Sequence, residues 1–418
     1  MLRELCALHG HTEDRVWHVS WSPKGTHLAS CGEDRVVRIW ASSSNDWEES
    51  GSIHVVATLE DAQTRTIRCC EWSPNCKQLA CASFDGTVVV WEAQNRQKTR
   101  WEQVAVLEGH ENEVKSVAWS CGGRWLATCG RDKKVWVWER LQTGTGSEFE
   151  CVSMLDGHTQ DVKFVQWHPR YEQILFSGSY DDTVKVWGFD EDDECYCLHT
   201  LTGHASTVWG IAVQDNTPVD EDPSKPYYEP PSRMLTCGSD LSLRLWEQDI
   251  PPGGKDRARG EWREKHILNG LHQFPIYSVS WNSDPRVQCE NILAGTGIAS
   301  GGLIATGGGD NTINILQIRA DSSGNPQLEH VQIVREAHEG DINCVRWGPR
   351  VASEMAEQDP FVSKFLGSEI GTRSAMGDEV ARGNLPHDYA SGYLPTSHIL
   401  ASAADDGTIR LWHFVAND

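Results

Sequence analysis

The chain has 418 residues, of which 19 are Trp and 37 are Gly, and its formal net charge at pH 7 is −23. A chain this acidic is poorly suited to bind nucleic acid or an anionic membrane surface, because both are recognised through Lys and Arg. No apolar run reaches transmembrane length, and Met1–Ser20 lacks the apolar core and cleavage site of a secretory leader, so we expect the cytosol, with the nucleus as a second compartment.

The first predicted strand is the apolar segment of residues 2–8, which precedes the pair Gly10-His11. A repeat follows it: Ser or Thr, Asp four residues later, and Trp six residues after the Asp. The five full copies are Ser30/Asp34/Trp40, Thr128/Asp132/Trp138, Ser177/Asp181/Trp187, Thr236/Asp240/Trp246 and Ser402/Asp406/Trp412. Two copies depart from the pattern, since Cys81/Asp85/Trp91 lacks the hydroxyl and Thr306/Asp310/Leu316 lacks the indole. Seven repeats at this period indicate a repeat architecture.

A His and an alternating apolar stretch precede most copies, as in Gly109-His110 before Trp119 and Gly157-His158 before Trp167. The second copy lacks the His. We predict that His, Ser or Thr, Asp and Trp form one hydrogen-bonded chain that joins adjacent strands, because such a chain satisfies polar groups that would be costly to bury alone. In the third and fourth repeats its members are His110, Thr128, Asp132, Trp138, His158, Ser177, Asp181 and Trp187. A recurring structural network is a better explanation than a Ser-His-Asp catalytic triad.

Each repeat predicts four strands, a to d; in the third, these are Val114–Trp119, Leu126–Cys129, Val135–Trp138 and a strand near Cys151–Leu155. The chain ends just after the seventh strand c, so residues 2–8 should supply the missing outer strand. The predicted fold is therefore all-β, a seven-bladed WD40 β-propeller closed by its N-terminal strand. We expect one domain over residues 1–418. Long a–b insertions at 215–232, 282–301 and about 348–397 should all lie on one face, the bottom.

The opposite, top face presents two side chains per blade. Strand a opens with Trp17, Arg68, Lys115, Lys163, Trp209, Tyr277 and Asn343, and the b–c turns present Glu33, Phe84, Arg131, Tyr180, Ser239, Gly309 and Asp405. Four cations and five aromatics at equivalent positions predict a site for a protein or peptide that is acidic and carries an aromatic group, since Arg and aromatics dominate binding hot spots. The alternative is that the cations are only solvated and the aromatics cap the channel.

The 14 cysteines include no C-x-x-C pair, and most of them lie in apolar strand contexts. Cys195 and Cys197 stand apart from these. A built-in zinc or iron–sulfur site is therefore not expected, and we predict no metal and no cofactor.

Two segments of the sequence resemble a known protein family. Glu108–Trp119 with Cys129–Trp138, and Gly157–His168 with Ser179–Trp187 and the acidic Asp190–Cys195, resemble blades three and four of the WD40 scaffold of cytosolic iron–sulfur protein assembly (CIA). The resemblance implies a non-catalytic scaffold that helps to deliver [4Fe–4S] clusters to cytosolic and nuclear apoproteins. It implies a targeting complex with a small acidic partner and a HEAT-repeat partner. It also matches Arg131 to a functionally important top-face Arg, in a family whose clients carry C-terminal tails with an acidic residue and a terminal aromatic.

Two other classes of protein compete with this interpretation. A substrate receptor of a ubiquitin ligase usually needs Trp-Asp-x-Arg after strand c, but no repeat Trp here is followed by Asp. A generic WD40 adaptor is a second alternative, beside the ubiquitin-ligase receptor. An enzyme would need a metal-ligand cluster, a phosphate loop or an isolated carboxylate pair, and none stands out, so we expect no catalysis.

Overall fold

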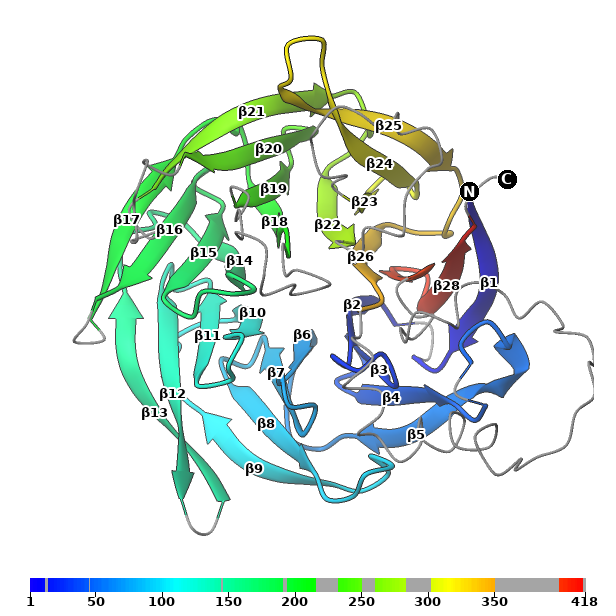
Figure 1. The fold of residues 1–418 in the computed structure, drawn as a ribbon. Coiled ribbons are helices and arrows are strands. Elements are labelled where there is room, and N and C mark those ends of the chain that lie inside the picture. The colour runs from blue at the N-terminus through cyan, green and yellow to red at the C-terminus, as the bar shows by residue number, and fades with distance from the viewer. Residues whose placement is uncertain are drawn as a thin grey trace, which may run out of the picture.

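The repeats fold into seven four-stranded antiparallel sheets among the residues that the computed structural model describes. Those residues are 1–11, 14–44, 46–143, 146–190, 194–215, 232–249, 260–282, 302–349 and 398–415. The sheets stand around a common axis as the blades of a ring (Figure 1). The predicted seven-bladed β-propeller is therefore confirmed.

The strands of the first four blades are consecutive in the chain. Blade 1 holds β2 (Val16–Trp21), β3 (Leu28–Gly32), β4 (Val37–Ser42) and β5 (Ile53–Leu59). Blade 2 holds β6 (Ile67–Trp72), β7 (Gln78–Ser83), β8 (Val88–Ala93) and β9 (Trp101–Leu107). Blade 3 holds β10 (Val114–Trp119), β11 (Trp125–Gly130), β12 (Val135–Thr143) and β13 (Gly146–Leu155). Blade 4 holds β14 (Val162–Trp167), β15 (Ile174–Ser179), β16 (Val184–Phe189) and β17 (Cys195–Leu201).

The last three blades include the strand that closes the ring. Blade 5 holds β18 (Val208–Val213), β19 (Arg233–Gly238), β20 (Ser242–Asp249) and β21 (Glu261–Asn269). Blade 6 holds β22 (Ile276–Asn282), β23 (Leu303–Gly308), β24 (Ile313–Ala320) and β25 (Pro326–Val334). Blade 7 holds β26 (Ile342–Trp347), β27 (Ile399–Ala404), β28 (Thr408–Phe414) and β1 (Leu2–His9).

Strand β1 is the outer strand of blade 7, as residues 2–8 were predicted to be. It pairs antiparallel with β28, with Leu2 opposite Phe414 and Leu8 opposite Ile409 (Figure 1). Leu2 and Leu8 are buried, while the residues between them are exposed or partly exposed. The first and last segments of the chain thus join in one sheet, which leaves no open gap in the ring.

The core lies between neighbouring blades. Inner strands such as β11 are buried along their whole length, because both faces of each sheet pack on another blade, whereas outer strands such as β9 are only partly buried. Between blades 3 and 4, Phe189 stacks at 5.7 Å from both Trp125 and Trp167. Aromatic contacts of this kind carry much of the buried apolar area.

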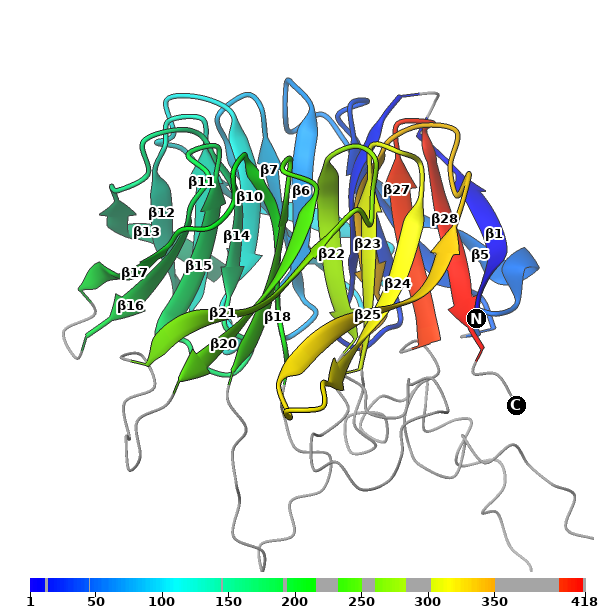
Figure 2. The same ribbon diagram turned by 90° about the horizontal axis from the view of Figure 1, so that it is seen from above.

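The short b–c turns lie along one edge of the ring, which is the predicted top face (Figure 2). The insertion expected at about 348–397 lies almost wholly outside the described residues, as do most residues of the 215–232 and 282–301 insertions. The helix found in the described part of the chain is the 3₁₀ turn η1 (Ser50–Ser52), and no helix there is long and apolar enough to cross a membrane.

Candidate functional site

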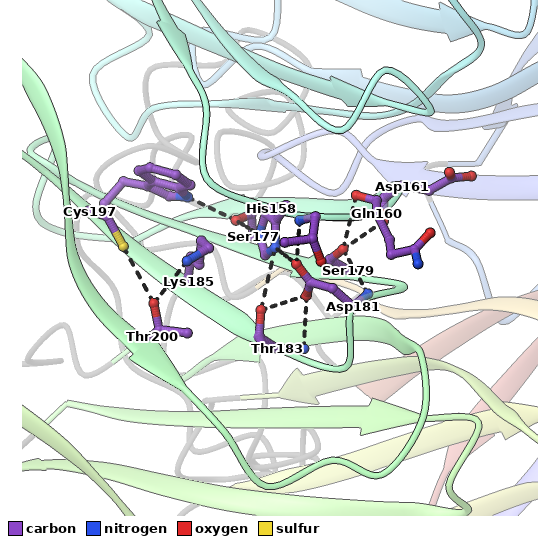
Figure 3. A network of polar contacts seen from close by, with 12 residues as sticks. His158, Gln160, Asp161, Ser177, Ser179, Asp181, Thr183, Lys185, Cys197 and Thr200 are labelled. Atoms are coloured by element: carbon purple, nitrogen blue, oxygen red, sulfur yellow. Dashed lines mark hydrogen bonds and ion pairs between the residues drawn. The ribbon is translucent and has the colours of Figure 1, made fainter.

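The His–Ser–Asp–Trp network is complete in blade 4 (Figure 3). His158 donates through Nδ1 to Asp181 Oδ2 at 2.8 Å, and its Nε2 lies 2.7 Å from Ser177 Oγ. Trp187 Nε1 donates to the same Ser177 Oγ at 2.8 Å. Ser177 has no exposed surface, and its oxygen is already engaged by the imidazole and the indole. It therefore cannot act as a nucleophile on a substrate.

The same geometry recurs around the ring. In blade 3, His110 lies 2.7 Å from Asp132 and 2.8 Å from Thr128, which accepts from Trp138 at 3.0 Å. The corresponding histidines of blades 1, 5, 6 and 7, with their Asp and hydroxyl partners, are His11/Asp34/Ser30, His204/Asp240/Thr236, His272/Asp310/Thr306 and His338/Asp406/Ser402.

The two degenerate blades use substitutes that the sequence interpretation missed. In blade 2, Gln63 takes the place of the His and donates to the carbonyl of Cys81 at 3.0 Å. In blade 6, where Leu316 replaces Trp, the Asn314 amide lies 3.1 Å from His272 Nε2. Gln63 stands at the same spacing before Cys81 as His110 before Thr128, so register alone could have revealed it.

The top-face residues of strand a share one backbone feature, a β-bulge. Every strand a has a β-bulge at this position, so the residue has no cross-strand partner. A bulge re-aims its side chain. Six of these residues line one small cavity in the central channel, with a volume of about 20 Å³: Arg68, Lys115, Lys163, Trp209, Tyr277 and Asn343.

The cations at the mouth of this channel rest on the predicted aromatics. The Arg68 guanidinium lies 4.9 Å from the Trp17 ring, and Lys115 Nζ lies 4.3 Å from Phe84. Lys163 Nζ lies 5.0 Å from the Tyr180 ring and 5.2 Å from the Trp209 ring. Trp209 in turn meets Tyr277 edge to face, with ring centroids 5.4 Å apart. Three cations from blades 2 to 4 thus lie among aromatic side chains from blades 1, 2, 4, 5 and 6.

Arg131 lies outside this cavity. Its side chain is 58% exposed and lies 3.4 Å from Glu113, which also pairs with Arg65. The structure therefore brings Lys115 and Lys163 to the channel, while Arg131 stands on the outer rim beside them. Burial acts to raise the pKa of Glu113, but its hydrogen bonds and the charges of Lys115 and Arg131 lower it below its usual value.

The opposite side of the mouth is acidic, which the sequence interpretation did not anticipate. Asp405 accepts from Asn343 at 2.7 Å and lies 3.4 Å from Arg15. Burial, followed by repulsion from Asp405, raises the pKa of Asp341. The mouth is thus positive over blades 2 to 4 and negative over blade 7.

His18, Cys69 and Glu71 bring their ligand atoms within 4.8 Å of one another, and His18 and Cys69 also line the small cavity. No sequence spacing signalled this group, because its members come from two blades. A guanidinium already stands there: Arg346 Nη2 lies 3.2 Å from His18 Nε2 and 3.4 Å from Glu71 Oε1. A metal ion would have to displace that cation, so the group is a weak candidate for a metal centre.

The ring of seven blades and its repeated His–Asp–Trp network define the class of WD-repeat propellers. The family model described as "WD domain, G-beta repeat" matches residues 2–41, 54–92, 101–139, 149–188, 195–247 and 389–413.

Similarity to individual proteins is more specific. The chain is 33% identical to "Probable cytosolic iron-sulfur protein assembly protein 1" of Scheffersomyces stipitis, over 80% of this chain and 90% of that protein. It is 35% identical to the protein of the same name from Mycosarcoma maydis, over 98% and 92% of the two chains. It is 32% identical to "Probable cytosolic iron-sulfur protein assembly protein CIAO1 homolog" of Caenorhabditis elegans, over 99% of both. The chain belongs to this WD-repeat family of cytosolic iron–sulfur protein assembly proteins.

Proposed function

We propose that the chain is a non-catalytic scaffold of the cytosolic iron–sulfur protein assembly machinery that helps to deliver [4Fe–4S] clusters to cytosolic and nuclear apoproteins. The role in this machinery follows from family membership. The scaffold role is supported by the channel mouth, which offers binding groups rather than a nucleophile with a base. The network hydroxyls are buried, and that of Ser177 is engaged by both His158 and Trp187.

The proposed partners are proteins: a small acidic subunit, a HEAT-repeat subunit and apo iron–sulfur clients. The observation that carries this proposal is the row of cations on aromatic faces over blades 2 to 4. An acidic group of a client would meet the cations, and an aromatic group would pack beside Tyr180 or Trp209. Since the relatives are named cytosolic, we place the chain in the cytosol, with the nucleus as a second proposed compartment.

The test is binding of a client tail that ends in an acidic–aromatic pair, measured for wild type and Arg131→Glu. Because Arg131 is a rim residue, reversal of its charge should weaken binding by about tenfold, or about 1.4 kcal/mol. Arg131→Gln should have a smaller effect. The melting temperature checks that both variants fold. Equal binding by all three proteins would show that Arg131 is not part of the binding site.

A further inference from the structure

The described residues that line the small cavity include four cations and no Asp or Glu. Arg68, Lys115 and Lys163 surround the cavity from adjacent blades, and Arg346 also lines it. Lys163 pairs with Asp161 at 3.2 Å, and Arg346 pairs with Glu71 at 3.4 Å.

Arg68 and Lys115 make no ion pair within the described part of the chain, where their nearest stabilising contacts are the faces of Trp17 and Phe84. These two cations therefore have no ion-pair partner there, and the carboxylates of Glu113 and Asp161 act on Lys115 only from a longer distance.

The burial of these cations has an electrostatic cost. Burial lowers the pKa of Lys115 to about 8, repulsion from Lys163 and Arg68 adds to that effect, and attraction to Glu113 and Asp161 offsets only part of it. Burial also lowers the pKa of Arg68. A buried cation that has no ion-pair partner is stabilised when an anion binds next to it, so such cations favour anion binding.

The cavity limits the size of such an anion. A volume of about 20 Å³ accepts a group about as large as one water molecule. Ser116 also lines the cavity, directly after Lys115 in strand β10, and its hydroxyl could donate to an anion. The larger part of a ligand would have to remain at the mouth.

We propose that the channel mouth is a binding site for one small oxyanion group, held by Arg68 and Lys115 with Lys163 beside them. The group is either a carboxylate of a protein chain or a free inorganic oxyanion. A divalent cation is disfavoured, because it would face these three cations and Arg346. The inference rests on the same cations as the proposed function and deepens it, since it limits the bound group to one small oxyanion and can be tested without any protein partner.

The experiment compares melting temperatures in acetate, phosphate and chloride at equal ionic strength, for wild type, Lys115→Met and Lys133→Met. Lys133 is a matched control, an exposed lysine on the b–c turn of the same blade. At ten times the dissociation constant, a bound anion should raise the melting temperature of wild type and Lys133→Met by about 2 °C. Lys115→Met should lose this shift, and in chloride it should melt above wild type, because an uncompensated charge has been removed.

The outcomes separate the sources of the anion. A shift in acetate that depends on Lys115 supports a carboxylate, and one in phosphate supports an inorganic oxyanion. Phosphate also stabilises proteins non-specifically, so only the part lost in Lys115→Met counts. An equal shift in Lys115→Met, or no shift in either anion, would overturn the inference. If acetate binds but a client tail does not, the proposed function fails while the anion site stands.

Discussion

Each network aspartate accepts hydrogen bonds from two sides. In blade 4, Asp181 accepts from His158 and also from the backbone N–H of Thr183, two residues ahead. Between them lies Asp182, whose φ of 67° is left-handed. Every blade has a left-handed residue after its network aspartate: Arg35, Gly86, Lys133, Asp182, Leu241, Asn311 and Gly407. The carboxylate therefore holds a strained b–c turn in place as well as orienting the His.

These contacts make stability depend on pH. Burial alone would raise the pKa of Asp310, but hydrogen bonds from His272, Gln273 and Thr312 outweigh it and lower the pKa to about 2. A lowered pKa in the folded state adds stability that is complete above the unfolded value near 4 and is lost as the pH falls toward 2. We expect Asp310→Asn to lower the free energy of unfolding at pH 7 by about 2 kcal/mol.

Urea denaturation between pH 7 and pH 3 measures this contribution. Wild type should lose stability over the acid range, and Asp310→Asn should lose less, because its side chain cannot titrate. Asp156→Asn, at an exposed aspartate, should keep the wild-type slope. An acid slope in Asp310→Asn as steep as that of wild type would show that Asp310 contributes nothing to it.

At the scale of the element, β1 converts an open row of blades into a ring. Leu2 is 5% exposed and Leu8 is 6% exposed, and both pack into the clusters on either side of blade 7. We expect Leu8→Ala to cost about 2–3 kcal/mol, because truncation of a buried Leu leaves a cavity. It should also increase light scattering on mild heating, because loosening β1 frees the edge of β28.

Arg3→Ala is the matched control, since Arg3 is an exposed residue of the same strand. Urea midpoints and static light scattering would compare the two variants with wild type. If Leu8→Ala were as stable as Arg3→Ala, closure by β1 would contribute little to the stability of the ring.

The elements were predictable because each repeat carries its own signals. The Asp-to-Trp spacing fixes strands b and c, and the alternation before Trp119 fixes strand a of blade 3. Two features depend on contacts between blades instead. The strand-a bulges cannot be inferred from a single strand, and the meeting of His18, Glu71 and Arg346 joins blades 1, 2 and 7. The top-face residues could be named from register, but the position of Arg131 outside the small cavity could not.

For the whole molecule, two electrostatic effects on an acidic ligand oppose each other. The formal net charge of −23 repels it at long range. The cations at the channel mouth attract it over the few ångströms of direct contact, and Arg68 and Lys115 have no ion-pair partner among the described residues to reduce that attraction. Salt screens exposed charges beyond a Debye length of about 10 Å at 0.1 M, so it weakens the long-range repulsion first.

The sign of the salt dependence therefore decides which effect controls binding. Salt anions compete with the acidic group for the mouth cations, and this competition should outweigh the screening of the long-range repulsion. We therefore expect the dissociation constant of an acidic–aromatic tail to rise several-fold between about 50 and 300 mM NaCl. Fluorescence anisotropy at each salt concentration would measure it, with Lys115→Met as the variant that should show a shallower dependence. Binding that tightens with salt would mean that the net charge prevails and that the tail does not contact the mouth. The same slope in Lys115→Met and wild type would place the acidic group elsewhere on the top face.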